Sequence, residues 1–173
     1  MATPAIQFFP YQSPLQRPSW QVWLPVLCGL SIICFESSPV MGGNQTGRWL
    51  ADIWPTILGQ ANTPFFGAVH HILRKIGHFT GYGTLGLFLM KAWRCSIRYY
   101  LQMIGSQLAV GASALSVSCT FLVGCLDEWH QQFIPGRTST RTDVLIDTCG
   151  ALLFNVIFWS VRTLRRRALT AGN

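Results

Sequence analysis

The chain has 173 residues, of which 50% are hydrophobic and only 11% are charged, whereas an average soluble domain carries about 25% charged residues. This composition excludes a largely disordered chain, because so much apolar mass must be buried, and the length excludes a large multidomain enzyme. What remains is one small domain, either soluble with an apolar core or embedded in a membrane.

The N-terminal residues 1–19 differ from the rest of the chain. They contain four prolines and a single charge, Arg17. They lack the ordered basic and apolar regions of a cleavable signal peptide. We therefore expect a disordered, proline-rich cytoplasmic tail, followed by a first helix that is retained.

Four stretches of the chain are almost free of charged residues. A helix that crosses a bilayer needs roughly 20 apolar residues, and four such stretches would leave a soluble bundle few polar faces for water. We therefore predict an all-α, polytopic membrane protein with four transmembrane helices, in a membrane domain that covers residues 20–165. The stretches are residues 20–35, 76–90, 101–126 and 144–161.

The basic residues divide unequally between the two sides of this predicted domain. The side that holds both termini and the segment after the second span carries eight: Arg17, Lys91, Arg94, Arg98, Arg162, Arg165, Arg166 and Arg167. The other side carries five: Arg48, Arg74, Lys75, Arg137 and Arg141. Because basic residues concentrate in cytoplasmic segments, we expect a bacterial inner-membrane protein with both termini in the cytoplasm, including a basic tail at 166–173. We interpret the net charge of +7 as topology and contact with membrane lipids, not as nucleic-acid binding.

Between the first two spans, apolar residues recur at the spacing of one helix face. Two of them are tryptophans, which are common where a helix lies in the membrane interface. The pattern predicts a short interfacial helix, and a short helix packed against the bundle is the alternative. The stripe consists of Trp49, Leu50, Ile53, Trp54, Ile57 and Leu58.

A further helix is predicted to begin at Thr63, a residue type that caps helices, followed by Pro64 at the first helical position. We expect this helix to continue without a break into the second span. Gly77 and Gly81 form a GxxxG pattern on it, which permits close approach of another helix. Its outer end carries a polar stripe of His71, Lys75, His78 and Tyr82.

The third span carries small and polar residues on one face: Ser113, Ser116, Thr120, Gly124, Asp127 and Gln131. We interpret the hydroxyl-bearing part as a tight helix–helix contact in which side chains bond to backbone. The face ends at Asp127 and its neighbour Glu128. An ionisable side chain near membrane depth is costly to bury and needs a partner or a function.

Polar residues therefore converge near the outer ends of the second, third and fourth spans. Arg137 lies in the loop before the fourth span, and Asp143 and Asp147 lie one turn apart at that span's outer end. Two cations face four carboxylates in this predicted cluster, before histidines are counted, so the charges must be strongly coupled. The members are Lys75, His78, Tyr82, Asp127, Glu128, His130, Gln131, Arg137, Asp143 and Asp147.

Two segments within this region resemble the VanZ-like family of small integral membrane proteins. They read KIGHFTGYGTLGLFL and DEWHQQFIPGRTSTRTDVLIDTCGALL, and the likeness covers roughly residues 70 to 160. The residues that match the family's two-part pattern are Lys75, His78, Phe79, Tyr82, Asp127, Glu128, Gln131, Phe133, Pro135, Arg137, Asp143, Asp147 and Gly150. The family's namesake is associated with resistance to a glycopeptide antibiotic that binds cell-wall precursors, so the resemblance implies an envelope-facing role without a defined biochemical activity.

Three functions fit the predicted cluster. In the first, which we favour, it binds a lipid headgroup, a cell-wall precursor or an envelope protein without catalysis. In the second, Asp127, Glu128 and His78 serve a membrane-embedded hydrolase or transferase, with His130 joining them around a divalent cation in one version. In the third, the charges form a structural ion-pair network. We expect no cofactor and no resident metal, because the chain has neither an HExxH motif nor a nucleophile elbow.

The charge distribution predicts the topology. A reporter that is active only in the cytoplasm should give signal when fused after Arg98 and none when fused after Arg137. A cytoplasmic signal at Arg137 would place the polar cluster on the inner side and contradict the prediction.

Overall fold

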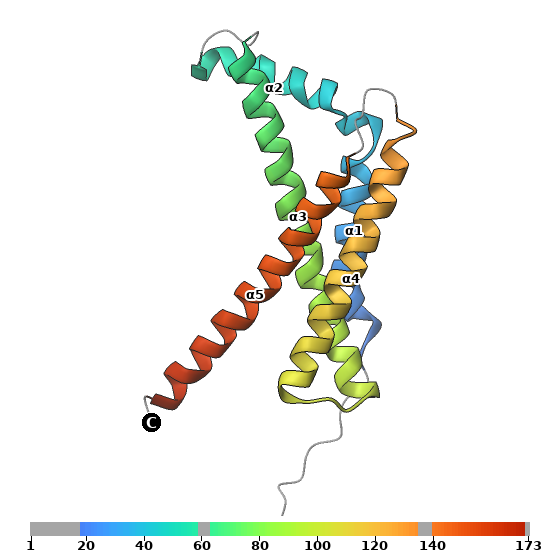
Figure 1. The fold of residues 1–173 in the computed structure, drawn as a ribbon, viewed down its shortest axis with the longest axis vertical. Coiled ribbons are helices and arrows are strands. Elements are labelled where there is room, and N and C mark those ends of the chain that lie inside the picture. Colours follow the sequence, from blue (N-terminus) through green and yellow to red (C-terminus); the bar gives the residue numbers. More distant parts are fainter. Residues whose placement is uncertain (1–17, 59–62, 135–139, 172–173) are drawn as a thin grey trace, which may run out of the picture.

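The computed structural model describes residues 18–58, 63–134 and 140–171 (Figure 1). These residues form helices and no strand, so the predicted all-α class is confirmed. Residues 1–17 of the expected N-terminal tail and Arg137 lie outside the described residues. In chain order the elements are η1 (Trp20–Trp23), α1 (Leu24–Glu36), η2 (Pro39–Met41), α2 (Gly43–Leu58), α3 (Pro64–Tyr100), α4 (Gly105–Gln131) and α5 (Arg141–Ala171).

The three long helices α3, α4 and α5 contact one another, and α1 packs on α3. In Figure 1, α5 crosses α3 obliquely and diverges from it toward the C-terminus, while α2 lies across the start of α3. The end of α3, the start of α4 and the end of α5 lie at one end of the molecule. We call this the basic end, and we call the opposite end, where α4 ends and α5 begins, the polar end.

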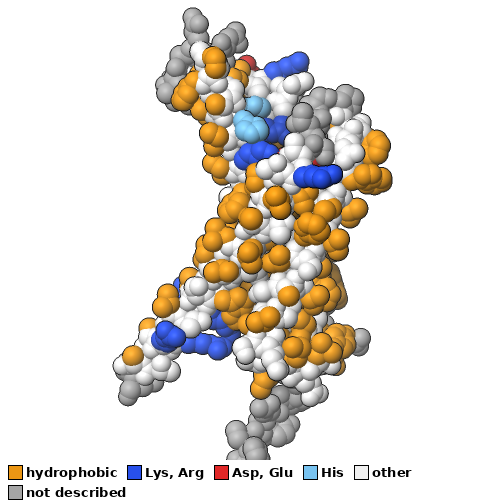
Figure 2. Space-filling model, viewed as in Figure 1, with side chains coloured by type: hydrophobic (Ala, Val, Ile, Leu, Met, Phe, Trp, Pro, Cys, Tyr) orange, Lys and Arg blue, Asp and Glu red, His pale blue; other side chains and the backbone are white. Residues whose placement is uncertain are grey.

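Two helices, α4 and α5, are long and apolar enough to cross a membrane, and η1 with α1 forms a shorter apolar helix, Trp20–Glu36. Figure 2 shows hydrophobic side chains spread over the middle of the visible surface, with Lys and Arg near its two ends. Such an exposed apolar band is typical of a helical membrane protein. The crossing of the membrane by all four predicted spans stays a prediction.

The start of α3 follows the predicted capping pattern. The Thr63 hydroxyl accepts a hydrogen bond from the Phe66 N–H at 3.2 Å, and the helix then runs unbroken to Tyr100. The predicted helix before it also exists, as α2. Its Trp54 is buried against Phe65 and Phe66, whereas Trp49 is exposed. Only part of the apolar stripe therefore packs on the rest of the protein, and the side chains of Ile57 and Leu58 lie outside the described structure.

The backbones of α3 and α5 touch where these helices cross. A methyl group added at Gly150 would overlap the carbonyl oxygen of Phe79, and one added at Gly86 would lie 2.7 Å from the Cβ of Ala151. The GxxxG pattern is not the site of this close contact, because nothing lies within 4 Å of a Cβ added at Gly77, and one added at Gly81 meets only the Glu36 carboxylate, at 3.9 Å. At 100° per residue, positions 77 and 81 lie on the opposite side of α3 from positions 79 and 86.

The polar face of α4 is buried, as its sequence predicts. The Ser116 hydroxyl donates to the carbonyl oxygen of Gly86 on α3 at 2.6 Å, and the Trp159 indole of α5 donates to the Ser113 hydroxyl at 2.9 Å. The Asn155 amide of α5 lies 3.4 Å from the Ser116 hydroxyl. Hydroxyl groups thus connect all three long helices.

The close crossing makes Gly150 intolerant of a side chain. We expect Gly150→Ala to lower the free energy of unfolding by about 1–3 kcal/mol, because the obstructing atom belongs to backbone and cannot swing away. The matched control, Gly77→Ala, should be neutral or stabilising by up to about 1 kcal/mol, because it meets nothing and removes a flexible helical glycine. Unfolding in mixed micelles titrated with SDS measures both, and equal effects would contradict this account.

Candidate functional site

The polar end contains a cluster of buried polar side chains contributed by three helices. The carboxylates of Asp127, Glu128, Asp143 and Asp147 are all buried, and Asp147 is 0% exposed. The structure brings together eight of the predicted site residues at this end. From α3 come Lys75, His78 and Tyr82; from α4 come Asp127, Glu128 and Gln131; from α5 come Asp143 and Asp147.

Asp127 links three parts of the fold. One of its carboxylate oxygens accepts a hydrogen bond from the Tyr82 hydroxyl at 2.9 Å and another from the Gln131 amide at 2.8 Å. The same Gln131 nitrogen lies 3.5 Å from the hydroxyl of Ser37, just after α1. A buried carboxylate requires such donors, because burial removes the water that would otherwise solvate its charge.

The two carboxylates of α5 face basic side chains of α3. Lys75 forms an ion pair with Asp143. The Nδ1 atom of His78 lies 3.5 Å from an oxygen of Asp147, which is long for a hydrogen bond. Asp147 also packs against Gly124 of α4, where an added Cβ would lie 3.5 Å from its carboxylate. The α5 register therefore places one acidic residue opposite each base.

Glu128 occupies a different position from Asp127. One of its oxygens accepts a hydrogen bond from the backbone N–H of Thr140 at 2.8 Å, so it links α4 to the chain just before α5. Within the described residues, its other oxygen has no hydrogen-bond partner. The neighbouring carboxylates of α4 thus have separate partners, one in the helix contact and one at the start of α5.

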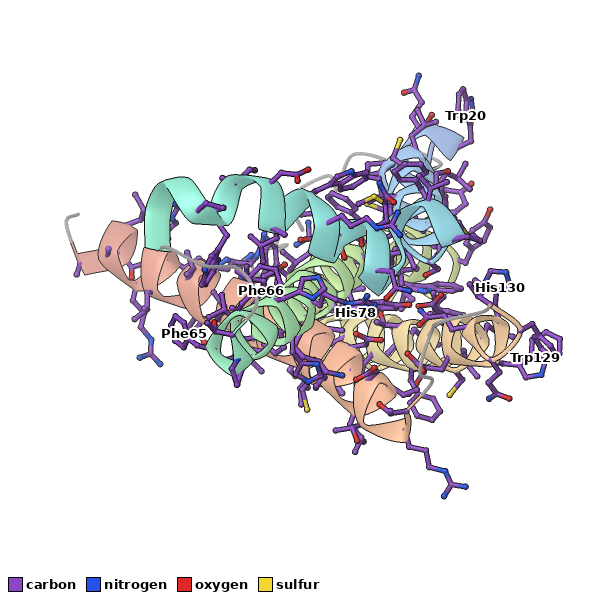
Figure 3. All side chains as sticks on the ribbon, turned by 90° about the horizontal axis from the view of Figure 1, so that it is seen from above. Trp20, Phe65, Phe66, His78, Trp129 and His130 are labelled. Atoms are coloured by element: carbon purple, nitrogen blue, oxygen red, sulfur yellow. The ribbon has the colours of Figure 1, made fainter. Side chains whose placement is uncertain are left out.

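The predicted association of His130 with this cluster is wrong. His130 is exposed and points outward at the edge of the molecule, beside Trp129, while His78 lies near the centre (Figure 3). The reason is helical rotation, because position 130 lies roughly 100° from the buried residue at position 131. Among the described residues, no three His, Cys, Asp or Glu side chains are placed to hold a metal ion together.

A polar groove of about 320 Å³ opens beside the cluster. Three histidines and two cationic residues of α3 line it, and the first turn of α2 forms another wall. The guanidinium of Arg74 lies directly against Gly43, so a side chain at that position would have to displace it. The lining residues are Gly43, Asn44, Gly67, His70, His71, Arg74, Lys75, His78, Gln131 and Asp143.

The groove is electrostatically positive on its α3 side. Burial, together with the positive charge of Arg74 and the proximity of His71, lowers the pKa of His70 from its ordinary value. The groove side chains offer several donors to an anion, and a guanidinium can bind a phosphate or carboxylate with two parallel hydrogen bonds. Sequence reasoning missed Asn44, His70 and Arg74 as groove residues, because α2 is placed beside α3 only by the fold.

Comparison with known proteins agrees with the residue pattern. A family model described as VanZ/LLP1 matches residues 5–163, which is most of the chain and extends beyond the segment in which the resemblance is visible by eye. Searches of curated proteins and of solved structures returned no match.

The shared hydrogen bond predicts coupling between Tyr82 and Asp127. In a double-mutant cycle, Tyr82→Phe and Asp127→Asn should show an interaction energy of about 1 kcal/mol or more in the free energy of unfolding, since each removes one side of the same bond. The control cycle pairs Tyr82→Phe with Glu128→Gln, whose bond goes to Thr140. Those two effects should add within about 0.5 kcal/mol. Equal coupling in both cycles would argue against the separate roles of the two carboxylates.

Proposed function

Because the chain belongs to the VanZ/LLP1 family, we propose that it acts at the bacterial cell envelope by binding the anionic part of a lipid headgroup or cell-wall precursor. In this proposal it spans the inner membrane several times, with both termini in the cytoplasm and the polar end facing outward. The ligand chemistry is a phosphate or pyrophosphate ester. The observation that carries the proposal is the groove of about 320 Å³ beside the buried carboxylates.

The buried carboxylates support the groove by positioning two of its basic side chains. Asp143 holds Lys75 and Asp147 faces His78, so both bases are oriented before a ligand arrives. Such preorganisation favours binding, because less side-chain freedom is lost when the ligand binds. Arg74 and His71 add positive or polar groups on the adjoining turn of α3. Of the described residues, Asp143 is the one carboxylate that lines the groove, and its pairing with Lys75 offsets its charge.

The groove volume limits the ligand. Sites for small molecules commonly measure about 300–1,000 Å³, so this groove suits a phosphorylated headgroup and leaves no space for its hydrocarbon chains. A lipid-linked ligand would keep its chains in the membrane beside the helices. The position of the groove at the end of the apolar helices agrees with such an arrangement.

A structural role is the alternative that the same contacts favour. Tyr82–Asp127 joins α3 to α4, and Lys75–Asp143 joins α3 to α5. If these bonds serve stability alone, their loss should reduce the amount of folded protein, while substitutions in the groove wall should change nothing. Arg74 separates the two functions, because it lines the groove and none of the bonds just named depends on it.

We expect inorganic pyrophosphate to bind the purified full-length protein in a zwitterionic detergent, as measured by isothermal titration calorimetry. Arg74→Gln should weaken binding by roughly 10-fold or more, because a charge-assisted hydrogen bond is lost. The control is Arg48→Gln, which removes an exposed charge of α2 outside the groove and should leave the affinity unchanged. Absence of binding, or equal loss in the two variants, would contradict the proposal.

A further inference from the structure

The basic end of the molecule has no acidic residue of its own. Asp and Glu are absent from residues 1–35, 79–126 and 148–173, so all six acids belong to other parts of the chain. The described basic residues at this end are Lys91, Arg94, Arg98, Arg162, Arg165, Arg166 and Arg167. Their counter-charge must therefore come from outside the protein.

An apolar groove of about 660 Å³ lies at this end, along α5 and beside Leu87 of α3. It occurs where α5 diverges from α3 after their crossing (Figure 1). Its wall is apolar from Phe154 to Val161, three arginines follow, Arg162, Arg165 and Arg166, and Leu169 completes the lining. The α5 residues that line the groove recur three or four positions apart, so they form one continuous face of the helix.

The arginines of the groove are held near other positive charges. The positive charges of Arg94 on α3 and of Arg166 both act on the Arg162 guanidinium. Arg162 lies over the ring of Trp159, 5.9 Å from its centroid, and the Trp159 indole is itself bonded to Ser113 of α4. A group of like charges this close together attracts an anion.

We propose that this groove binds one anionic phospholipid, with an acyl chain along the apolar wall and the phosphate at Arg162, Arg165 and Arg166. The order of groups along α5 matches the order along a lipid. From Phe154 to Arg166 the helix rises about 18 Å, close to the roughly 15 Å hydrocarbon thickness of one leaflet. The site lies at the end opposite the polar groove and does not depend on the function proposed for that groove.

A second copy of the chain is the competing occupant of the groove. Pairing two copies through this face would bring the arginines of both α5 helices together. No carboxylate occurs in residues 148–173 to offset them, so the contact would be repulsive. A phospholipid supplies both the missing negative charge and an apolar chain.

Native mass spectrometry of the full-length protein, with phosphatidylglycerol and phosphatidylcholine of identical acyl chains, tests the site. The wild-type protein should bind one phosphatidylglycerol in preference to phosphatidylcholine. Replacing the three groove arginines, by Arg162→Gln, Arg165→Gln and Arg166→Gln together, should reduce that preference by roughly fivefold for each arginine. The control combines Lys91→Gln, Arg98→Gln and Arg167→Gln, which removes the same charge outside the groove lining and should retain the preference.

A second variant tests the apolar wall without changing any charge. Val161→Trp fills part of the groove and should weaken binding of the lipid. The elution volume and the helical circular dichroism of this variant should match those of the wild-type protein, which would show that it is folded. If the triple variant fails to fold, Arg165→Gln alone replaces it, with Arg167→Gln as its control.

Four results would overturn the proposal. These are equal binding of the two lipids by the wild type, equal loss in the groove and control variants, unchanged lipid binding by Val161→Trp, and a lipid-free dimer that Val161→Trp dissociates. Equal loss would indicate general attraction to surface charge, and the dimer would identify a second copy as the occupant. None of these results bears on pyrophosphate binding at the polar end.

Discussion

The backbone contact between α3 and α5 determines where the other features of this protein lie. At Gly150, α5 approaches the Phe79 carbonyl so closely that no side chain fits between the helices. On one side of this crossing, the first turns of α5 are held beside α3, and Asp143 and Asp147 meet Lys75 and His78. On the other side, α5 diverges and the apolar groove opens (Figure 1). One close contact thus separates two sites of different chemistry.

Charge is distributed along the same axis. The buried carboxylates lie at the polar end, where Tyr82 and Lys75 of α3, Gln131 of α4 and the Thr140 backbone contact three of them, and the basic end contains no Asp or Glu. Between the ends, α4 contributes a face of hydroxyl groups that bond to its neighbours. In a membrane, where water is not available to solvate polar groups, every such group needs a partner inside the protein or in the lipid. The polar end meets this requirement partly within the protein, through the bonds of Asp127 and Glu128 and the Lys75–Asp143 pair, and we infer that the basic end meets it with lipid.

The two proposed sites differ in how their charges are compensated. Lys75 and His78 face carboxylates of α5, so the polar groove is built around internal pairs. The charges that act on Arg162 are instead those of Arg94 and Arg166, which are also positive. A ligand at the polar groove would therefore add to a network that already exists. A ligand at the basic end would supply the negative charge that this end of the protein lacks.

Much of the candidate site could be predicted from the sequence because helical spacing is local. The stripe from Ser113 to Gln131 and the pair Asp143 and Asp147 lie on buried faces, as positions three and four residues apart must share a side of a helix. The start of α3 at Pro64, after the Thr63 cap, followed from local capping chemistry for the same reason. Family membership was visible in the residues themselves, in the two segments that carry the motif.

The tertiary structure decided what sequence spacing leaves open, namely which faces meet. Spacing alone drew attention to Gly77 and Gly81, whereas the helices touch through Gly86 and Gly150, because the rotation of α3 relative to α5 depends on packing between distant segments. The fold also brings the start of α2 over Arg74 to form the polar groove, a contact between segments about 30 residues apart that no local spacing indicates. The sequence by itself determined which residues share a helix face, and only the packing of long helices decided the partner of each face.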